Sequence, residues 1–266
     1  MTDESHGRET WLVAAWPGMG HVGAGAVAHL IDALSPALVQ ELPAEEFFDV
    51  AHVDVQRGIA RAAPLPRSLM LEWSAAEAPR DLLLFLGEAQ PSERGMRMCR
   101  RIMDLAQARG VTRVLTFAAM ASQLHPAGEP RVFGAVSDPS MLAEVRERGV
   151  ELLEEGQVAG LNGLLLAAAA ERSVPAACLL GEMPFFAAAI RNPRASAAVL
   201  EAFVGLSGIE VDLGPLHEAA RELEPMILEL MERLREATGN EPGEMGLPEL
   251  PSEEPESAAG AGAGAG

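Results

Sequence analysis

The chain has 266 residues, of which 48% are hydrophobic, and a formal net charge of −19. This length accommodates one large α/β domain or two small ones, and the negative charge argues against sequence-independent binding to nucleic acid or to an anionic membrane. All 20 basic residues are arginine, and neither lysine nor tyrosine occurs, which excludes lysine nucleophiles and tyrosine acids.

The first half of the chain alternates strand and helix patterns after a polar lead at residues 1–9. The predicted strands are Trp11 to Trp16, Ala37 to Leu42, His52 to Val55, Ile59 to Ala62, Ser68 to Trp73 and Asp81 to Gly87. Helices are predicted over His21 to Leu34 and about Glu93 to Arg109. The short segments from His52 to Trp73 are typical of antiparallel hairpins, whereas the continuous apolar run at Asp81 to Gly87 indicates a strand buried on both faces.

The second half continues the alternation. Strands are predicted over Val111 to Ala118, Val132 to Val136 and Pro175 to Leu180, and helices over Pro139 to Arg148, Gly163 to Arg172, Asn192 to Leu206 and about Pro215 to Ala237. Asn192 followed by Pro193 is typical of a helix start. Buried strands that alternate with helices predict a three-layer α/β/α sandwich with a mostly parallel sheet and some antiparallel hairpins.

One domain is therefore expected over residues 10–239, followed by a Pro-, Glu- and Gly-rich tail at 240–266 that is expected to be disordered. The longest apolar run, Val158 to Ala170, is shorter than the roughly 20 residues of a membrane span. The acidic, polar N-terminus does not look like a signal peptide. A cytoplasmic location is expected.

Six residues after the first strand spell G-x-G-x-x-G, the pattern of a dinucleotide-binding loop: Gly18, Met19, Gly20, His21, Val22 and Gly23. Glu41, 18 positions after Gly23, stands where such a fold places its ribose-binding acid. However, Pro17 removes a backbone N–H beside the loop, and hairpins follow instead of a second nucleotide-binding unit. We therefore expect these glycines to serve backbone geometry, and no cofactor is predicted.

No catalytic group and no metal site is identified. Ser122 and His125 are close in sequence, but such proximity is weak evidence for a dyad. His21 and His29 are eight positions apart and do not share a helix face. Cys99 and Cys178 are expected to be buried small hydrophobes.

Two acidic residues, Glu88 and Glu182, each follow a glycine at the end of a buried strand, where open parallel sheets bind ligands. Gln90, Asn162 and Gly163 complete a candidate crevice or interface with the glycine loop. A ligand role and a structural role in turns and caps both remain open for these residues.

An apolar stretch after the last strand contains Met183, Phe185 and Phe186. Core packing and a protein-contact patch are both open interpretations. The last helix has one apolar face, for which core packing is favoured, and Pro225 is expected to bend it or to mark a boundary.

Several stretches, in order over about residues 10 to 225, resemble the proteasome assembly chaperone family that is named for its second chaperone, in its prokaryotic branch. They are "WPGMGHVG", Phe47-Phe48, "DLLLFLGEAQP", "GVTRVLTFAAM", "RVFGAVSD", "GQVAGLNGLLL", "PAACLLGEMP" and "NPRASAAVLEAF". The resemblance implies a phosphorylase/hydrolase-like α/β/α sandwich, homo-oligomers, and ATP-independent chaperoning of proteasome subunits. Family members often dock through a C-terminal hydrophobic-tyrosine-any motif, whereas this chain has no tyrosine and ends in "AGAGAG".

The resulting expectation is a non-enzymatic cytoplasmic chaperone or scaffold that forms homo-oligomers and binds protein partners, among them possible proteasome subunits. The alternative is a small-ligand-binding protein or a phosphorylase- or nucleosidase-like enzyme at the strand ends. The alternative requires Glu88, Asn162 and Glu182 to converge beside the glycine loop. The chaperone interpretation requires an apolar surface that is exposed or lies between subunits.

Overall fold

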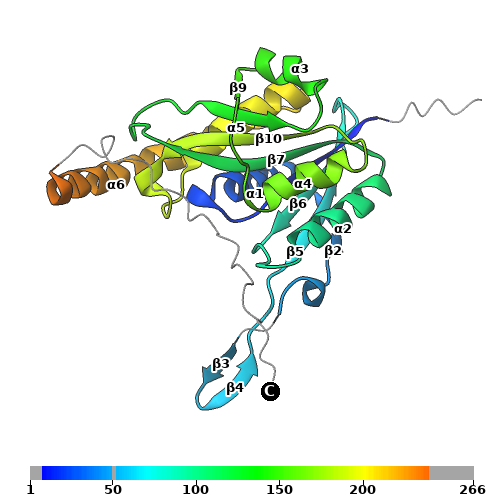
Figure 1. Cartoon of the computed structure of the whole chain (residues 1–266), viewed down its shortest axis with the longest axis horizontal. Coiled ribbons are helices and arrows are strands. Elements are labelled where there is room, and N and C mark those ends of the chain that lie inside the picture. Colours follow the sequence, from blue (N-terminus) through cyan, green and yellow to red (C-terminus); the bar gives the residue numbers. More distant parts are fainter. Residues whose placement is uncertain (1–7, 50–51, 240–266) are drawn as a thin grey trace, which may run out of the picture.

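The computed structural model describes residues 8–49 and 52–239 (Figure 1). The predicted N-terminal lead is described only from Arg8, and the predicted tail at 240–266 lies outside the described residues.

Strands and helices alternate along the described residues. The strands are β1 (Thr10–Ala15), β2 (Ala37–Glu41), β3 (Val53–Gln56), β4 (Ile59–Ala62), β5 (Ser68–Trp73), β6 (Asp81–Gly87), β7 (Val111–Ser122), β8 (Val132–Val136), β9 (Val150–Leu152) and β10 (Ala176–Pro184). The helices are α1 (Val22–Leu34), α2 (Gly95–Gln107), α3 (Met141–Glu147), α4 (Gly160–Ala170), α5 (Pro193–Ser207) and α6 (Gly214–Thr238), with short 3-10 turns η1 (Met19–His21), η2 (Ala44–Glu46) and η3 (Phe185–Ala187).

Eight strands form one sheet in the order β2-β5-β6-β1-β7-β10-β8-β9. The four central strands, β6, β1, β7 and β10, are parallel, whereas β5 is antiparallel to β6 and β8 is antiparallel to β10. This arrangement confirms the predicted mostly parallel sheet. It also brings the carboxyl ends of the central strands to one edge, which is where open α/β sheets bind ligands.

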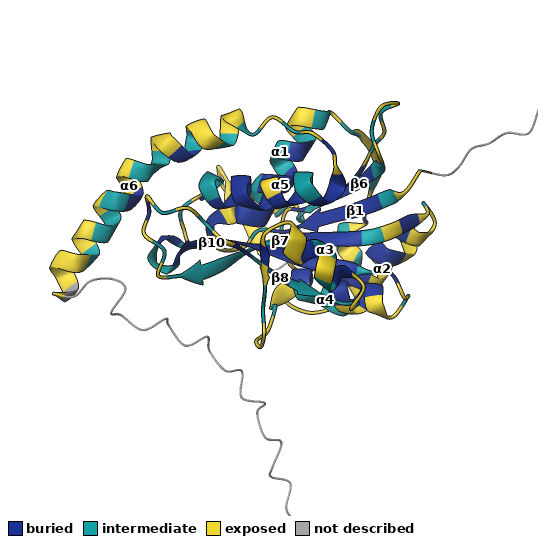
Figure 2. Ribbon diagram, turned by 90° about the horizontal axis from the view of Figure 1, so that it is seen from above, coloured by how far each residue is buried: buried dark blue, intermediate teal, exposed yellow. Residues whose placement is uncertain are grey.

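The side chains of β1 alternate between two cores, because successive residues of a strand point to opposite faces. Trp11, Val13 and Ala15 pack with α1, α5 and α3. Leu12, Ala14 and Trp16 pack with α2 and α4 on the other face. Helices therefore cover both faces of the sheet, and the dark central layer of Figure 2 shows how completely the central strands are buried.

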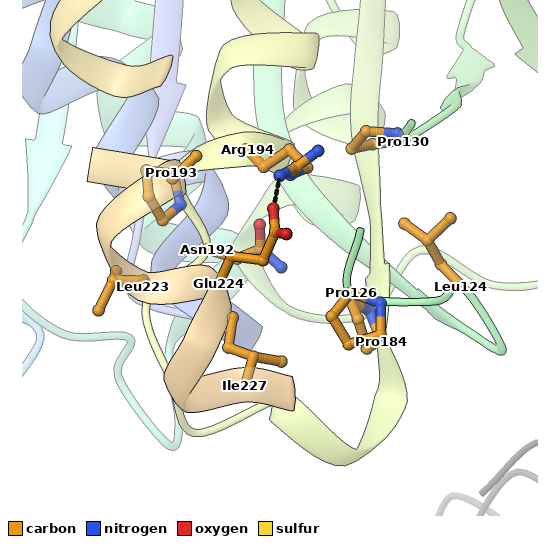
Figure 3. A pocket seen from close by; sticks show the side chains of 11 residues that line it. Leu124, Pro126, Pro130, Pro184, Asn192, Pro193, Arg194, Leu223, Glu224 and Ile227 are labelled. Atoms are coloured by element: carbon orange, nitrogen blue, oxygen red, sulfur yellow. Dashed lines mark hydrogen bonds and ion pairs between the residues drawn. The ribbon is translucent and has the colours of Figure 1, made fainter. Parts of the chain in front are cut away.

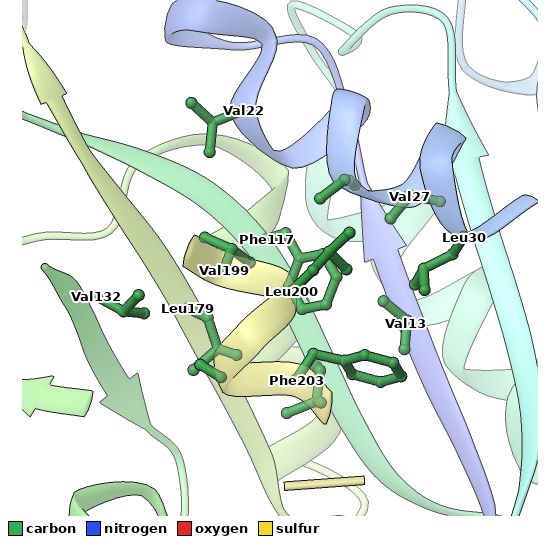
Figure 4. Close-up of a cluster of buried hydrophobic side chains, with 14 of the residues drawn as sticks. Val13, Val22, Val27, Leu30, Phe117, Val132, Leu179, Val199, Leu200 and Phe203 are labelled. Atoms are coloured by element: carbon green, nitrogen blue, oxygen red, sulfur yellow. The ribbon is translucent and has the colours of Figure 1, made fainter. Parts of the chain in front are cut away.

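The core on the α1 and α5 side is the one drawn in Figure 4, where strand side chains meet those of both helices. Phe203 of α5 lies edge to face against Phe117 of β7, with ring centroids 5.9 Å apart, and both side chains are fully buried. The α5 helix begins as predicted, because the Asn192 side chain accepts a hydrogen bond from the Ala195 N–H at 3.0 Å.

The clearest differences from the sequence prediction are in β7, β10, β9 and α4, which begins at Gly160 and not at Gly163. Both β7 and β10 run about four residues beyond their expected ends, because they pair with each other as far as Ser122 and Pro184. The added residues include alanine, glycine, glutamate and proline, which have low strand propensity. The short strand β9 was not predicted. The α6 helix continues through Pro225, and Figure 2 shows it curving as it leaves the body.

Two elements extend away from the body. One is the β3–β4 hairpin, which Figure 1 shows beyond the β2 and β5 edge of the sheet. Its turn, Arg57 and Gly58, has positive φ at both positions (52° and 81°), the geometry that favours tight hairpins. The other is the distal half of α6, since Ile227 is the last α6 residue of the hydrophobic core.

The core contact at Phe203 gives a stability prediction. We expect Phe203→Ala to lower the free energy of unfolding by about 3–5 kcal/mol, because it leaves a cavity against Phe117, and Phe203→Leu to cost less. Urea denaturation followed by circular dichroism measures both changes. Glu201→Ala, an exposed change on the same helix, is the control and should stay within about 0.5 kcal/mol of the wild type. A loss below about 1 kcal/mol for Phe203→Ala would contradict the described packing.

Candidate functional site

An open groove of about 410 Å³ lies at the carboxyl end of β6, between α1, α6 and the start of α5. Its walls are largely small or apolar, and they include Ala28, Leu216 and Leu223. Five titratable residues border the groove: His21, His29, Asp32, Glu88 and Arg191. The volume is in the range of small-molecule sites, so this groove is the candidate site at the strand ends.

The glycine loop forms one end of the groove and is itself held by backbone hydrogen bonds. The Gly20 N–H donates to the Ala188 carbonyl at 2.7 Å, and the Gly20 carbonyl accepts from the Asn192 N–H at 2.8 Å. Gly20 has a φ of +58°, and a Cβ there would lie 2.6 Å from the Met183 sulfur. The N–H that a pyrophosphate-binding loop would offer is therefore engaged within the protein.

The last glycine of the motif allows α1 to approach the sheet. A Cβ on Gly23 would lie 2.0 Å from the Phe117 carbonyl oxygen, whereas one on Gly18 would meet nothing within 4 Å. Met19, between Gly18 and Gly20, remains 43% exposed. The motif thus works as a packing turn, and Glu41, its candidate ribose acid, forms a two-bond ion pair with Arg67 at 2.8 and 2.9 Å.

Gln90 does not enter the groove but connects two segments near the other core. Its Nε2 donates to the Pro17 carbonyl at 2.9 Å, and its Oε1 accepts from the Leu161 N–H at 3.0 Å. The side chain therefore joins the strand end before the glycine loop to the start of α4. Gly160, with a φ of +71°, leaves room for it.

Asn162 and Gly163 lie on α4 and serve its packing. Asn162 is 8% exposed, and its carbonyl accepts from the Thr116 hydroxyl at 3.4 Å. Its side-chain Oδ1 is buried with no hydrogen-bond partner in the described residues. A Cβ on Gly163 would lie 1.9 Å from the Val158 carbonyl oxygen, so only glycine permits that contact.

The two candidate carboxylates lie in different places. Glu88 borders the groove and accepts from the Arg67 N–H at 2.8 Å. Glu182 is only 3% exposed and is held by the Arg131 guanidinium through bonds of 2.8 and 2.9 Å at the β10–β8 pairing. Hydrogen bonds from Arg131 lower the pKa of Glu182 despite its burial, which disfavours a role as a general acid. The structure does not bring Glu88, Asn162 and Glu182 into one pocket.

The remaining candidate nucleophiles make local contacts. Ser122 Oγ accepts from the Leu124 N–H, and His125 Nδ1 accepts from the Ala127 N–H, so each stabilises its own turn. The Ser122 hydroxyl also hydrogen-bonds to the Glu182 carboxylate and contributes to lowering the pKa of Glu182. Both cysteines are buried, and burial raises the pKa of the Cys99 and Cys178 thiols to about 12. In the described ranges, no group of three His, Cys, Asp or Glu side chains has the arrangement of a metal site.

The apolar stretch after β10 divides between core and surface. Met183 is fully buried beneath Gly20, whereas Phe185 and Phe186 are half-buried with ring centroids 5.7 Å apart. A small hollow beside them, drawn in Figure 3, is lined by Leu124, Pro126, Pro184 and Ile227 and is bordered by the Arg194–Glu224 ion pair. Its volume of about 10 Å³ holds a single water at most.

Large apolar side chains are exposed elsewhere in the described residues. Two of them lie in features already identified from the sequence: Met19 in the glycine loop and Met226 on the apolar face of the last helix. The sequence reasoning did not single out the other five, which are Leu38, Val39, Val53, Val55 and Ile59. In β3, valine alternates with polar residues, and this pattern could have predicted an apolar face on that strand. The helices in the described part of the chain include none with the length and hydropathy needed to cross a membrane.

The two outer glycines of the motif provide a matched pair of variants. We expect Gly23→Ala to destabilise the fold by at least about 2 kcal/mol, because the new methyl group collides with the Phe117 carbonyl and the backbone of α1 must move away. Gly18→Ala should change the unfolding free energy by less than about 0.5 kcal/mol, since Gly18 is extended and unobstructed. Chemical denaturation measures both. Equal effects would refute the packing role of Gly23.

The Glu182–Arg131 pair predicts a pH dependence. Because the folded-state pKa of Glu182 lies below its ordinary value of 4.5, the ionised carboxylate stabilises the fold above that pH, and the contribution is lost as the pH falls through the lower pKa. Arg131→Met should therefore destabilise most at neutral pH, with the difference from wild type shrinking below about pH 4.5.

Melting temperatures from pH 3 to 8 check this expectation. Arg100→Met is the control, because its ion pair with Glu171 is exposed and should contribute less than about 1 kcal/mol. A difference between wild type and Arg131→Met that stays constant with pH would contradict the prediction.

Known proteins match this chain over most of its length. A sequence model of the PAC2 family matches residues 12–231. An uncharacterised protein of Methanocaldococcus jannaschii is 26% identical over 245 residues, which cover 89% of this chain and 90% of that protein. The crystal structure of Pyrococcus furiosus PbaB, described as an archaeal proteasome activator, has a TM-score of 0.70 and 26% identity and covers 84% of this chain and 93% of that one.

A PAC2 family protein from Streptomyces avermitilis has the same TM-score of 0.70, with 27% identity over 84% of this chain and 97% of that one. The two solved structures share the fold of this chain over nearly their full lengths. The chain belongs to the PAC2 family.

Proposed function

We propose that this chain is a non-enzymatic, cytoplasmic chaperone or scaffold that forms homo-oligomers and binds protein partners, with proteasome subunits as the first partner class to test. The relationship to PbaB supports the partner class. The observation that carries the proposal is the contrast between engaged polar side chains and free apolar ones. Gln90 and Glu182 are held in structural hydrogen bonds, whereas apolar side chains remain exposed on elements that leave the body.

The distal half of α6 is the proposed partner-binding surface. After Ile227, the last α6 residue of the core, the helix continues to Thr238. Leu230 and Met231 on this half are only partly buried, and Met226 is 45% exposed. Figure 2 shows this half leaving the body with alternating exposed and partly buried residues. A helix that presents one apolar side beyond its own core is suited to lie against a partner protein.

The test uses purified proteasome α and β subunits from the source organism. Wild-type protein is expected to bind the α subunits in sedimentation or interferometry experiments and to accelerate assembly of the 20S particle. The double variant Met226→Glu, Leu230→Glu should weaken binding at least tenfold, because two apolar contacts worth about 1–2 kcal/mol each are replaced by charges.

Arg233→Glu is the matched control, since it changes the net charge by the same amount on a side chain that is 72% exposed. It should stay within about twofold of wild type. If neither the subunits nor the assembled particle binds, the proteasome role is refuted. If both variants bind like wild type, α6 is not the surface.

A second candidate function rests on the groove, whose size and border of histidine, acidic and arginine side chains favour a small polar ligand such as a nucleoside. Thermal-shift titration with purine nucleosides, with and without phosphate, tests it. A rise in melting temperature that is lost in Asp32→Asn would support a ligand site. An unchanged melting temperature up to millimolar ligand would refute it.

A further inference from the structure

The β3–β4 hairpin, Val53–Gln56 and Ile59–Ala62 with the turn between them, is here called the arm. All eight strand residues of the arm are exposed. Val53 and Val55 are 55% and 65% exposed, values that are unusual for valine in a folded domain. An isolated two-stranded hairpin is at best marginally stable in water, so the arm needs a surface to cover it.

The arm has one apolar face. The register pairs Val53 with Ala62 and Val55 with Ala60, and paired residues point to the same side of a hairpin. These four side chains therefore share a face that contains no polar group. The opposite face carries Asp54, Gln56, Ile59 and Arg61.

The arm is also basic within an acidic chain. It has Arg57 and Arg61 against the single acid Asp54, whereas the chain as a whole has a net charge of −19. Neither arginine forms an ion pair with another described residue. The partner surface that this arm fits is therefore apolar and acidic.

Such a surface lies at the nearby edge of the sheet. On the edge strand β2, Leu38 and Val39 are 54% and 37% exposed. The end of β2 and the segment that follows it, residues 41–49, contain four acidic residues and no basic one. Two of the four, Glu45 and Glu46 of η2, make no ion pair within the described part of the chain. We call Leu38, Val39, Glu45 and Glu46 the acceptor edge.

We propose that the arm of one copy of this chain docks on the acceptor edge of a second copy. The apolar face of the arm covers Leu38 and Val39, and Arg57 at the turn pairs with Glu45 or Glu46 of that second copy. Arg61 leaves the arm from its opposite face and adds to the attraction between the basic arm and the acidic edge. The apolar contact removes exposed valine and leucine surface from water, and the opposite charges offset the repulsion between two copies of an acidic protein. This inference rests on the homo-oligomer in the proposed function and assigns its contact residues.

Charge reversal tests the docking directly. Sedimentation velocity of wild type at about 5–100 µM is expected to show a multiple of the 28.1 kDa chain mass. The arm variant Arg57→Glu, Arg61→Glu and the edge variant Glu45→Arg, Glu46→Arg should each weaken self-association at least tenfold, because like charges then meet.

Mixing the two variants is the decisive step. In an equimolar mixture the acidic arm of one variant meets the basic edge of the other, and the original basic arm meets the original acidic edge. The oligomer mass should therefore return. A chain that carries all four substitutions should associate like wild type for the same reason.

The matched control is Arg97→Glu, Arg101→Glu on the exposed side of α2, which changes the charge as much as the arm variant and should leave the mass unchanged. Circular dichroism and melting temperature verify that each variant is folded. The chain variant Val53→Asp, Val55→Asp provides an independent test of the apolar contact and should also dissociate.

The outcomes separate this proposal from the one before it. If the oligomer persists in both charge variants, the arm contact is refuted but self-association is not. The same holds if the variants dissociate and do not reassociate when they are mixed. A wild type of 28.1 kDa at every concentration overturns self-association itself, while subunit binding by α6 is measured separately.

Discussion

The close approach of α1 to the central sheet is the constraint on which the rest of the structure depends. No side chain other than hydrogen fits between Gly23 and the Phe117 carbonyl. This contact sets the position of the turn before it, so that Gly20 exchanges hydrogen bonds with Ala188 and Asn192. Asn192 in turn caps α5, and Ser196 Oγ donates to the Val22 carbonyl at 2.9 Å. One glycine contact thus links a strand, two helices and the loop between β10 and α5.

The same contacts limit which groups at the carboxyl ends of the strands are available to bind a ligand or to take part in catalysis. In a nucleotide-binding loop the glycine N–H groups remain free for phosphate oxygens. Here the Gly20 N–H donates to the Ala188 carbonyl and so holds the segment that leads into α5. Gln90 and Glu182 are likewise bonded to other segments, and burial keeps both thiols protonated. Apolar side chains stay exposed on the arm and on α6, which favours protein binding over chemistry.

Much of the fold was predictable because burial leaves a strong pattern in the sequence. The continuous apolar run at Asp81 to Gly87 and the Asn192-Pro193 pair predicted β6 and the start of α5 with their observed bounds. The extra length of β7 and β10 was not predictable, since it depends on pairing between segments that are more than 50 residues apart.

The candidate site was harder to predict. The position of a residue at the end of a strand shows at which end of the sheet it lies, but not toward which face or neighbour its side chain points. Asn162 belongs to the core on the α2 and α4 side, and Glu182 pairs with an arginine from the neighbouring strand connection. Neither fact leaves a local signal in the sequence. His29 and Asp32, by contrast, are three positions apart on one helix, and that spacing could have pointed to the groove.

Arginine side chains connect separate segments at the surface of this protein through two-bond ion pairs with glutamate. The pairs are Arg67–Glu41, Arg100–Glu171 and Arg131–Glu182. Since none of the 266 residues is lysine, these contacts contain no side-chain amine. Cellular tags that mark proteins for degradation are attached to lysine amines. A chain without lysine therefore offers the enzymes that attach such tags no side-chain amine.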